Sequence, residues 1–135
     1  MAALGVLASA TLAACGGGGD NETTAPTTQA GGGGGGGGGA QTLPLKAVPS
    51  GAFAYQEKTL SAKSGSVTID FDNPAQIDHD VCVEGPSGDQ LGCSDVVAAG
   101  KATLSVDLSQ PGSYTYYCSV DQHREAGMEG TLTVK

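Results

Sequence analysis

The stretch SYTYYCSVDQHREAGMEGTLTVK (residues 113–135) holds both a strand pattern and a candidate binding site. It begins with alternating aromatic and polar residues and ends with the alternating run TLTV, and both runs are typical of β-strands with one buried face. Between them, Cys118, His123 and Met128 follow one another at intervals of five residues. A thiol, an imidazole and a thioether can all bind a soft or borderline metal ion. The stretch therefore predicts a strand, a loop with potential metal ligands and a final strand.

The same alternation of apolar and polar residues continues upstream, without a sustained helical period. Turn residues such as Asn73-Pro74 and Pro111-Gly112 separate the apolar runs. We predict strands near 51–56, 58–63, 66–72, 79–84, 90–97, 102–109, 113–119 and 130–135. Seven or eight short strands with one apolar face each predict an all-β fold, a Greek-key antiparallel β-sandwich.

Composition limits the fold to one domain. The chain has 135 residues, and nine of its 23 glycines form one uninterrupted run at residues 31–39. We therefore place the folded domain at residues 43–135. The formal net charge is −8 and the six basic residues are scattered singly, so we exclude a nucleic-acid partner. An acidic surface favours solubility, and we expect a monomer.

The N-terminal residues 1–14, MAALGVLASATLAA, are apolar and uncharged. They are too few to span a bilayer and predict a signal segment. The segment LAAC that ends at Cys15 resembles a bacterial lipobox. The resemblance implies that Cys15 is lipidated and becomes the new N-terminus. We accordingly expect an extracytoplasmic protein, anchored to a bacterial membrane by this lipid, on its periplasmic or outer face.

The Gly- and Thr-rich residues 15–42 predict a linker between the anchor and the domain. They contain almost no apolar side chains, so they cannot bury enough surface to offset the entropy of ordering. A Gly-rich coil of this length has an end-to-end distance of roughly 30 Å. The linker would thus leave the domain close to the membrane and free to reorient.

Strand parity predicts which side chains meet in the core. Cys118 shares its strand face with Tyr114 and Tyr116, so we expect the thiol to point inward. His79 likewise shares a face with apolar valines of its strand. His79 and Cys118 can therefore converge at one end of the core, whereas the neighbouring Cys82 points the other way.

Cys82 and Cys93 lie on adjacent predicted strands, joined by a loop with the turn sequence GPSG. Outside the cytoplasm such a pair usually oxidises, so we predict a disulfide between them. Two free thiols or a second metal site are the alternatives. Neither a CxxC motif nor a nearby histidine supports the metal site.

The candidate ligands favour copper over other metals. One thiolate, two imidazoles and a weak thioether form the His₂Cys set with an axial Met that holds blue copper. Structural zinc prefers four strong ligands and rarely uses Met. A nucleophilic pair of Cys118 and His123 is another alternative, but it leaves His79 and Met128 without a role.

At these residues the sequence resembles the cupredoxins, the type 1 blue copper proteins of the plastocyanin and azurin kind. The resemblance covers about residues 52–135, and the ligand spacing is most similar to auracyanins and halocyanin-like bacterial lipoproteins. It implies one type 1 copper ion, with His79, Cys118 and His123 as equatorial ligands and Met128 as the weak axial ligand.

The resemblance also implies a function. Members of the family are not enzymes but carry single electrons between redox protein partners, in weak and transient encounters. A copper-delivery lipoprotein without an electron-carrier role is the alternative. Asp80 stands where many relatives have Asn and can accept hydrogen bonds from the backbone or hydroxyl of Ser119. Its negative charge predicts a reduction potential on the low side for the class.

Overall fold

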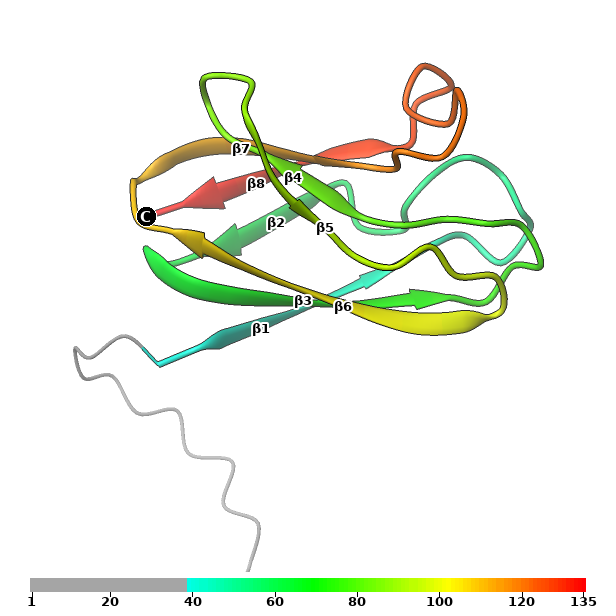
Figure 1. Ribbon diagram of the computed structural model, residues 1–135, viewed down its shortest axis with the longest axis horizontal. Coiled ribbons are helices and arrows are strands. Elements are labelled where there is room, and N and C mark those ends of the chain that lie inside the picture. The colour runs from blue at the N-terminus through cyan, green and yellow to red at the C-terminus, as the bar shows by residue number, and fades with distance from the viewer. Residues whose placement is uncertain (1–38) are drawn as a thin grey trace, which may run out of the picture. The chain divides into compact units, whose positions relative to one another are not determined.

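The computed structural model describes residues 39–135, which form a sandwich of eight β-strands (Figure 1). The predicted all-β sandwich is confirmed. The predicted signal segment at residues 1–14, the lipidation site Cys15 and nearly all of the predicted linker at residues 15–42 lie outside the described residues. Within the described part of the chain, no helix has the length and apolarity that crossing a membrane requires.

The first sheet contains three strands in the order β1-β3-β6, which are β1 (Gln41–Lys46), β3 (Gly65–Asn73) and β6 (Gly100–Leu108). β3 and β6 pair antiparallel along their whole length, and the register places Val67 opposite Val106. The period-two pattern of both strands buries one face and exposes the other. The apolar residues of the two strands therefore lie side by side on the inner face.

The second sheet contains five strands in the order β2-β8-β7-β4-β5. They are β2 (Thr59–Ala62), β4 (Cys82–Glu84), β5 (Gln90–Cys93), β7 (Gly112–Tyr117) and β8 (Glu129–Val134). β7 pairs antiparallel with β8 on one side and with β4 on the other. Cys118 directly follows β7 and Met128 directly precedes β8, so the loop between these neighbouring strands begins and ends at predicted ligands.

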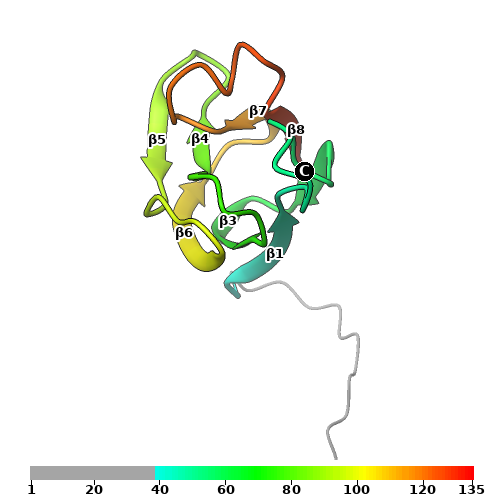
Figure 2. The same cartoon turned by 90° about the vertical axis from the view of Figure 1, so that its right-hand side faces the viewer.

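The core lies between the two sheets, which Figure 2 shows end-on. Its largest fully buried side chains include Tyr55 and Tyr116. The hydroxyl of Tyr55 donates to the carbonyl of Asp80 at 2.6 Å, and that of Tyr116 donates to the carbonyl of Glu57 at 2.6 Å. Burial raises the pKa of Tyr116 to about 12 and that of Tyr55 further still. Both phenols are therefore neutral donors at physiological pH, with their polar ends satisfied.

The sequence pattern did not predict β1, and two strand pairs are parallel rather than antiparallel. β1 pairs in parallel with β3, and β2 pairs in parallel with β8. Pro44 lies inside β1 and obscures the strand pattern, because proline has no N–H to donate to a ladder. β1 is an edge strand, where proline is tolerated. The first strand of the described residues thus begins at Gln41, inside the last part of the predicted linker at residues 15–42.

The predicted strand at residues 51–56 is wrong. These residues form a loop in which the N–H of Val48 donates to the carbonyl of Ala54 at 3.1 Å, and Gly51 has a φ of 77°. Only Tyr55 makes a bridge, with Ala47. The alternating aromatic residues resemble a strand pattern, but the left-handed conformation of Gly51 turns the chain there. β4 and β5 are also shorter than predicted, since a single bridge between His79 and Val97 lies outside them.

Cys82 and Cys93 form the predicted disulfide. They lie directly opposite each other on the antiparallel strands β4 and β5. Among the described residues, Cys118 is the only free cysteine, and it is buried. The disulfide therefore leaves a single thiol in the core for other chemistry.

Replacing both Cys82 and Cys93 with alanine is expected to lower the free energy of unfolding by about 2–3 kcal/mol, because the crosslink restricts the unfolded chain. Urea titration of the purified domain measures this change. Wild-type protein whose disulfide has been reduced serves as the control and should match the double variant. An unchanged midpoint in both would contradict the prediction.

Candidate metal centre

Cys118 occupies the end of the second sheet. Its side chain is fully buried, as is that of Tyr116, and Tyr114 of the same strand is also buried, which confirms the inward face predicted from strand parity. Its N–H donates to the carbonyl of Met128 at 3.0 Å, which continues the β7–β8 pairing by one residue. The thiol is therefore held by regular sheet structure rather than by a mobile loop.

His79 is also fully buried. Its backbone is fixed by two hydrogen bonds with Val97, at 3.1 Å from the His79 N–H and 2.9 Å to the His79 carbonyl. The buried side-chain amide of Asn73 donates to the carbonyls of Val97 and Ile77, at 2.6 and 2.8 Å. The end of β3 thereby positions the segment that carries His79, although that segment is not a regular strand.

The loop between β7 and β8, residues 118–128, carries His123. The N–H of His123 donates to the carbonyl of Val120 at 3.1 Å, which closes a turn. Asp121 within this turn has a φ of 43°, in the left-handed region that Asp tolerates better than most residues. The N–H of Met128 then donates to the carbonyl of His123 at 2.9 Å. The loop is thus a compact series of turns, which places His123 beside Cys118 at the end of the sheet.

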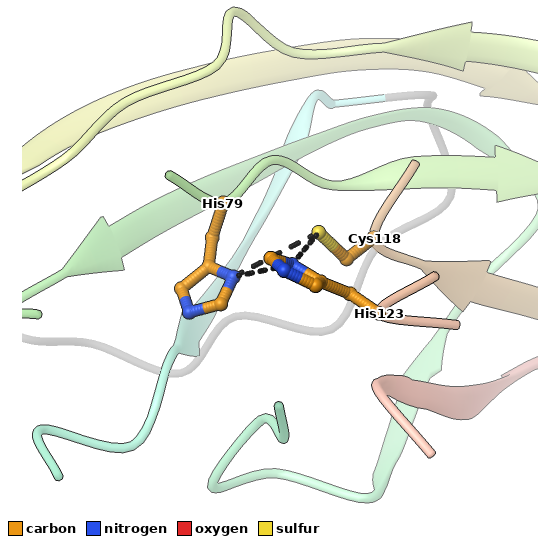
Figure 3. A group of neighbouring side chains, drawn as sticks. All are labelled: His79, Cys118 and His123. Carbon is orange, nitrogen blue, oxygen red and sulfur yellow. Dashed lines mark hydrogen bonds between the residues drawn. The ribbon is translucent and has the colours of Figure 1, made fainter. Parts of the chain in front are cut away.

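Three of the predicted ligands converge, as Figure 3 shows. The Cys118 Sγ lies 3.5 Å from Nδ1 of His123 and 3.8 Å from Nδ1 of His79. The two Nδ1 atoms lie 3.2 Å apart. A single ion with metal–ligand bonds of about 2.0–2.3 Å can contact all three donor atoms at these separations. The donor set therefore fits a metal ion, and one thiolate with two imidazoles is the set that favours copper.

Met128 is the fourth predicted ligand. Its side chain is fully buried, and its backbone bonds to both Cys118 and His123. Met128 thus lies in the same backbone network as these two ligands. Its role as the weak axial ligand stays a prediction from the family pattern.

The electrostatics of the site suit metal binding. Burial raises the pKa of the Cys118 thiol to about 11, so the thiol is protonated at neutral pH when no metal is bound. Burial and, second, the neighbouring His123 lower the pKa of His79, which keeps its imidazole neutral. Neutral imidazole is the form that binds metals. A metal ion at the site must displace the thiol proton, so its affinity should rise with pH.

Asp80 links the two segments that carry the ligands, as predicted. Its carboxylate accepts a hydrogen bond from the N–H of Ser119 at 2.7 Å and another from the Ser119 hydroxyl at 2.5 Å. Asp80 is almost fully buried. Because Asp80 follows His79 and Ser119 follows Cys118, these bonds fix the spacing of the two ligands.

Phe53 is a site residue that the sequence did not predict. Its ring stacks on that of His123, with centroids 4.0 Å apart and planes 19° apart, and it meets His79 edge-on at 6.3 Å. Phe53 is 40% exposed whereas His123 is only 7% exposed. His123 is therefore largely covered, and the exposed ring of Phe53 lies against it.

Comparison with known proteins identifies relatives along the folded part of the chain. A sequence model described as "Copper binding proteins, plastocyanin/azurin family" matches residues 44–135. The chain is 36% identical over 92 residues to the chloroplastic plastocyanin of Chlamydomonas reinhardtii, and the match covers 64% of this chain and 61% of the relative. It is 33% identical over 113 residues to the plastocyanin of Prochlorothrix hollandica, with 71% of this chain and 84% of the relative covered.

The solved structure of auracyanin B is similar in fold. It superimposes with a TM-score of 0.64 at 24% sequence identity, and the match covers 70% of this chain and 88% of that chain. This likeness supports the architecture of the sandwich.

Proposed function

The chain belongs to the plastocyanin/azurin family of copper-binding proteins, and from this membership we propose that it is a mononuclear type 1 copper protein that carries single electrons. The observation that supports the proposal most directly is the convergence of the Cys118 Sγ with the Nδ1 atoms of His79 and His123. These donors come from two segments far apart in the sequence. Their meeting in the core is not explained by packing alone.

The proposed roles of the four ligands follow from their chemistry. Cys118 would supply a thiolate, and His79 and His123 would supply imidazole nitrogens through Nδ1. Met128 would supply a thioether, the weakest of the four donors. Because these four side chains would together supply a full set of donors, no position would be left for a substrate, as a catalytic metal would need.

When bound, copper supplies one-electron chemistry by alternating between Cu(II) and Cu(I). The chain's contribution is to hold the ligands in one arrangement and to keep water away. Cys118, His79 and Met128 are fully buried, and the backbone hydrogen bonds of Met128 join it to Cys118 and His123. A rigid, dry ligand set needs little rearrangement when an electron moves, which favours fast transfer.

We place the proposed contact with redox partners at His123 and Phe53. The stacked rings lie where the site comes closest to solvent, and Phe53 is exposed. A shallow pocket beside them is also lined by Asp121 and Glu125, so the surface combines an aromatic ring with negative charge. Weak, transient encounters with a redox protein over a small interface fit such a surface.

We also propose that the domain works outside the cytoplasm, tethered to a membrane by lipid on Cys15. The lipobox-like sequence and the glycine-rich linker support this, together with the disulfide between Cys82 and Cys93. Disulfides persist in oxidising compartments outside the cytoplasm. Growth on labelled palmitate tests the anchor, because the wild-type chain but not a Cys15→Ala variant should incorporate label.

Titration of the metal-free domain with Cu(II) tests the proposed function. We expect one equivalent to bind, an intense visible band to form, and the band to vanish and return through reversible one-electron reduction. Fast electron self-exchange with slow copper loss to a chelator supports a carrier. Rapid loss of copper to the chelator with slow self-exchange would instead favour a copper-delivery protein.

Asp80→Asn is expected to raise the reduction potential by tens of millivolts. The buried carboxylate stabilises the more positive Cu(II), whereas an amide of the same shape is neutral. Asn can still accept from the Ser119 N–H and can donate to the Ser119 hydroxyl, so the geometry should be kept.

Redox titration followed by absorbance measures the change. Asp107→Asn, on the exposed face of β6, is the matched control and should leave the potential unchanged. A lower potential in Asp80→Asn would contradict the proposed electrostatic role.

A further inference from the structure

Arg124, the residue after His123, has the most extensively bonded side chain of the ligand loop. Its guanidinium makes two hydrogen bonds to the carboxylate of Glu84, at 2.9 and 3.2 Å. Its Nε donates to Glu129 at 3.3 Å. Its planar group also lies over the ring of Tyr117, with the central carbon 4.0 Å from the ring centroid. One side chain therefore joins the loop to three strands of the second sheet.

Two of the three partners of Arg124 are chain neighbours of the ligands. Tyr117 directly precedes Cys118, Glu129 directly follows Met128, and Arg124 itself directly follows His123. Glu84 lies on β4, the strand that continues from the segment of His79. The guanidinium thus contacts residues next to Cys118 and Met128 and follows His123 directly, and through Glu84 it also bonds to the strand that continues from His79.

We propose that Arg124 is a positioning residue of the copper centre, whose guanidinium holds the ligand loop against β4, β7 and β8 and so fixes His123. This inference rests on the proposed copper site. Arg124 touches no ligand atom in the structure and acts through the backbone. We call the set Arg124, Glu84, Tyr117 and Glu129 the arginine clamp.

The loop needs such support because its own sequence does little to stiffen it. Residues 118–128 contain no proline, and Gly127 is their only glycine. Asp121 adopts a left-handed conformation without being glycine, which carries a cost. Among residues 39–135, two side chains bond to the loop's backbone: Asp80 accepts from the N–H of Ser119 at 2.7 Å, and Lys58 Nζ donates to the carbonyl of Gly127 at 3.2 Å.

The geometry of the clamp requires arginine. A guanidinium presents several N–H groups in a fixed plane, which allows two parallel bonds to Glu84 while its face stacks on Tyr117. Lysine offers one point charge and cannot make all of these contacts together. The side chains of Arg124 and Glu84 are 36% and 22% exposed, so the network is only partly screened by water.

The test compares Arg124→Met with Arg124→Lys. Arg124→Met keeps most of the apolar side chain and removes the positive charge. Arg124→Lys keeps the charge but loses the planar group that makes two parallel hydrogen bonds to Glu84. Lys63→Met is the matched control, because it also removes one positive charge. Lys63 lies just after β2, at the far end of the sheet from the ligand loop, and takes part in none of the ion pairs among residues 39–135.

Three measurements are made on each variant. The first is the amide hydrogen exchange of residues 119–127 in the metal-free protein, and the second is the rate of copper release to a chelator. The third is the pair of visible absorption and electron paramagnetic resonance spectra of the Cu(II) form. For Arg124→Met we expect loop exchange and copper release to rise about tenfold, with altered spectra, since a bidentate charge network is worth more than an isolated surface pair. Arg124→Lys should recover only part of the loss, and Lys63→Met should match the wild type.

The outcomes separate the clamp from the proposed function. Wild-type spectra and copper release in Arg124→Met would overturn the clamp, as would full recovery in Arg124→Lys or an equal effect in Lys63→Met. A uniform rise in exchange across the whole domain would also overturn it, because Arg124 would then be a general stabiliser. If the wild type forms no intense copper band, the proposed function fails, while the exchange measurement on metal-free protein still decides whether the clamp holds the loop.

Discussion

Cys118→Ser abolishes the intense visible band of the Cu(II) form if the proposed site is correct. That band requires charge transfer from an anionic sulfur to copper, and Cys118 is the only free cysteine among residues 39–135. A serine hydroxyl is far less acidic than a thiol and is a much weaker ligand for copper. We expect the band to be lost entirely and copper to bind much more weakly.

Cys118→Ser is expected to remove the thiolate ligand without disturbing the fold. Serine is close in size to cysteine, and the Cys118 backbone bond to Met128 does not involve the side chain. Met128→Leu is the matched control, since it removes the proposed axial ligand and should shift the band while keeping most of its intensity. Retention of the full band in folded Cys118→Ser protein would exclude the proposed thiolate ligand and with it the type 1 centre.

The candidate ligands could be predicted because their positions follow from short-range rules. Strand parity placed the Cys118 side chain in the core, and the fixed intervals to His123 and Met128 lie within one loop between paired strands. His79 could be added because its own strand pattern pointed inward. These inferences depend on local alternation, which a single sequence reveals.

Phe53 and Arg124 could not be predicted because their contacts depend on loop conformation. Phe53 contacts His123 from a loop whose alternating aromatic residues had predicted a strand. Arg124 carries no signal in the sequence, since its partners Glu84 and Glu129 are far apart along the chain and meet only through the sheet. The surroundings of the site therefore depend on tertiary placement, whereas the ligands themselves depend on local pattern.

The strand missed at the N-terminal edge has a similar explanation. Pro44 argues against a strand wherever every N–H must be paired, and only the sheet order reveals that β1 lies at an edge. Likewise, the parallel pairing of β2 with β8 is invisible to an alternation pattern, which is the same for either direction. Strand existence could be predicted in most cases, whereas the parallel pairings of β1 with β3 and of β2 with β8 could not.

Gly130→Ala is expected to lower the free energy of unfolding by about 3 kcal/mol or more, at the upper end of the range for overpacking a core. Gly130 on β8 lies directly opposite Tyr116 on β7, and the aromatic ring of Tyr116 covers it. A Cβ atom at Gly130 would overlap the end of that ring, well inside van der Waals contact.

The ring of Tyr116 has no room to move away. It is fully buried, its hydroxyl donates to the carbonyl of Glu57 at 2.6 Å, and it packs against Tyr55 with centroids 5.5 Å apart. Relief of the overlap must therefore break the hydrogen bond, shift the core or separate β7 from β8. Because the β7–β8 pair frames the ligand loop, we also expect faster copper release in this variant.

Urea unfolding of metal-free protein measures the loss without any contribution from the ion. Gly85→Ala is the matched control: an added Cβ there meets no atom closer than 3.7 Å. We expect that control to change the free energy of unfolding by less than about 1 kcal/mol, as for a surface substitution. Equal stability of the two variants would mean that the Tyr116 ring can move away from Gly130 at little cost in free energy. That result would contradict the inference that the β7–β8 pair forms a rigid support for the ligand loop.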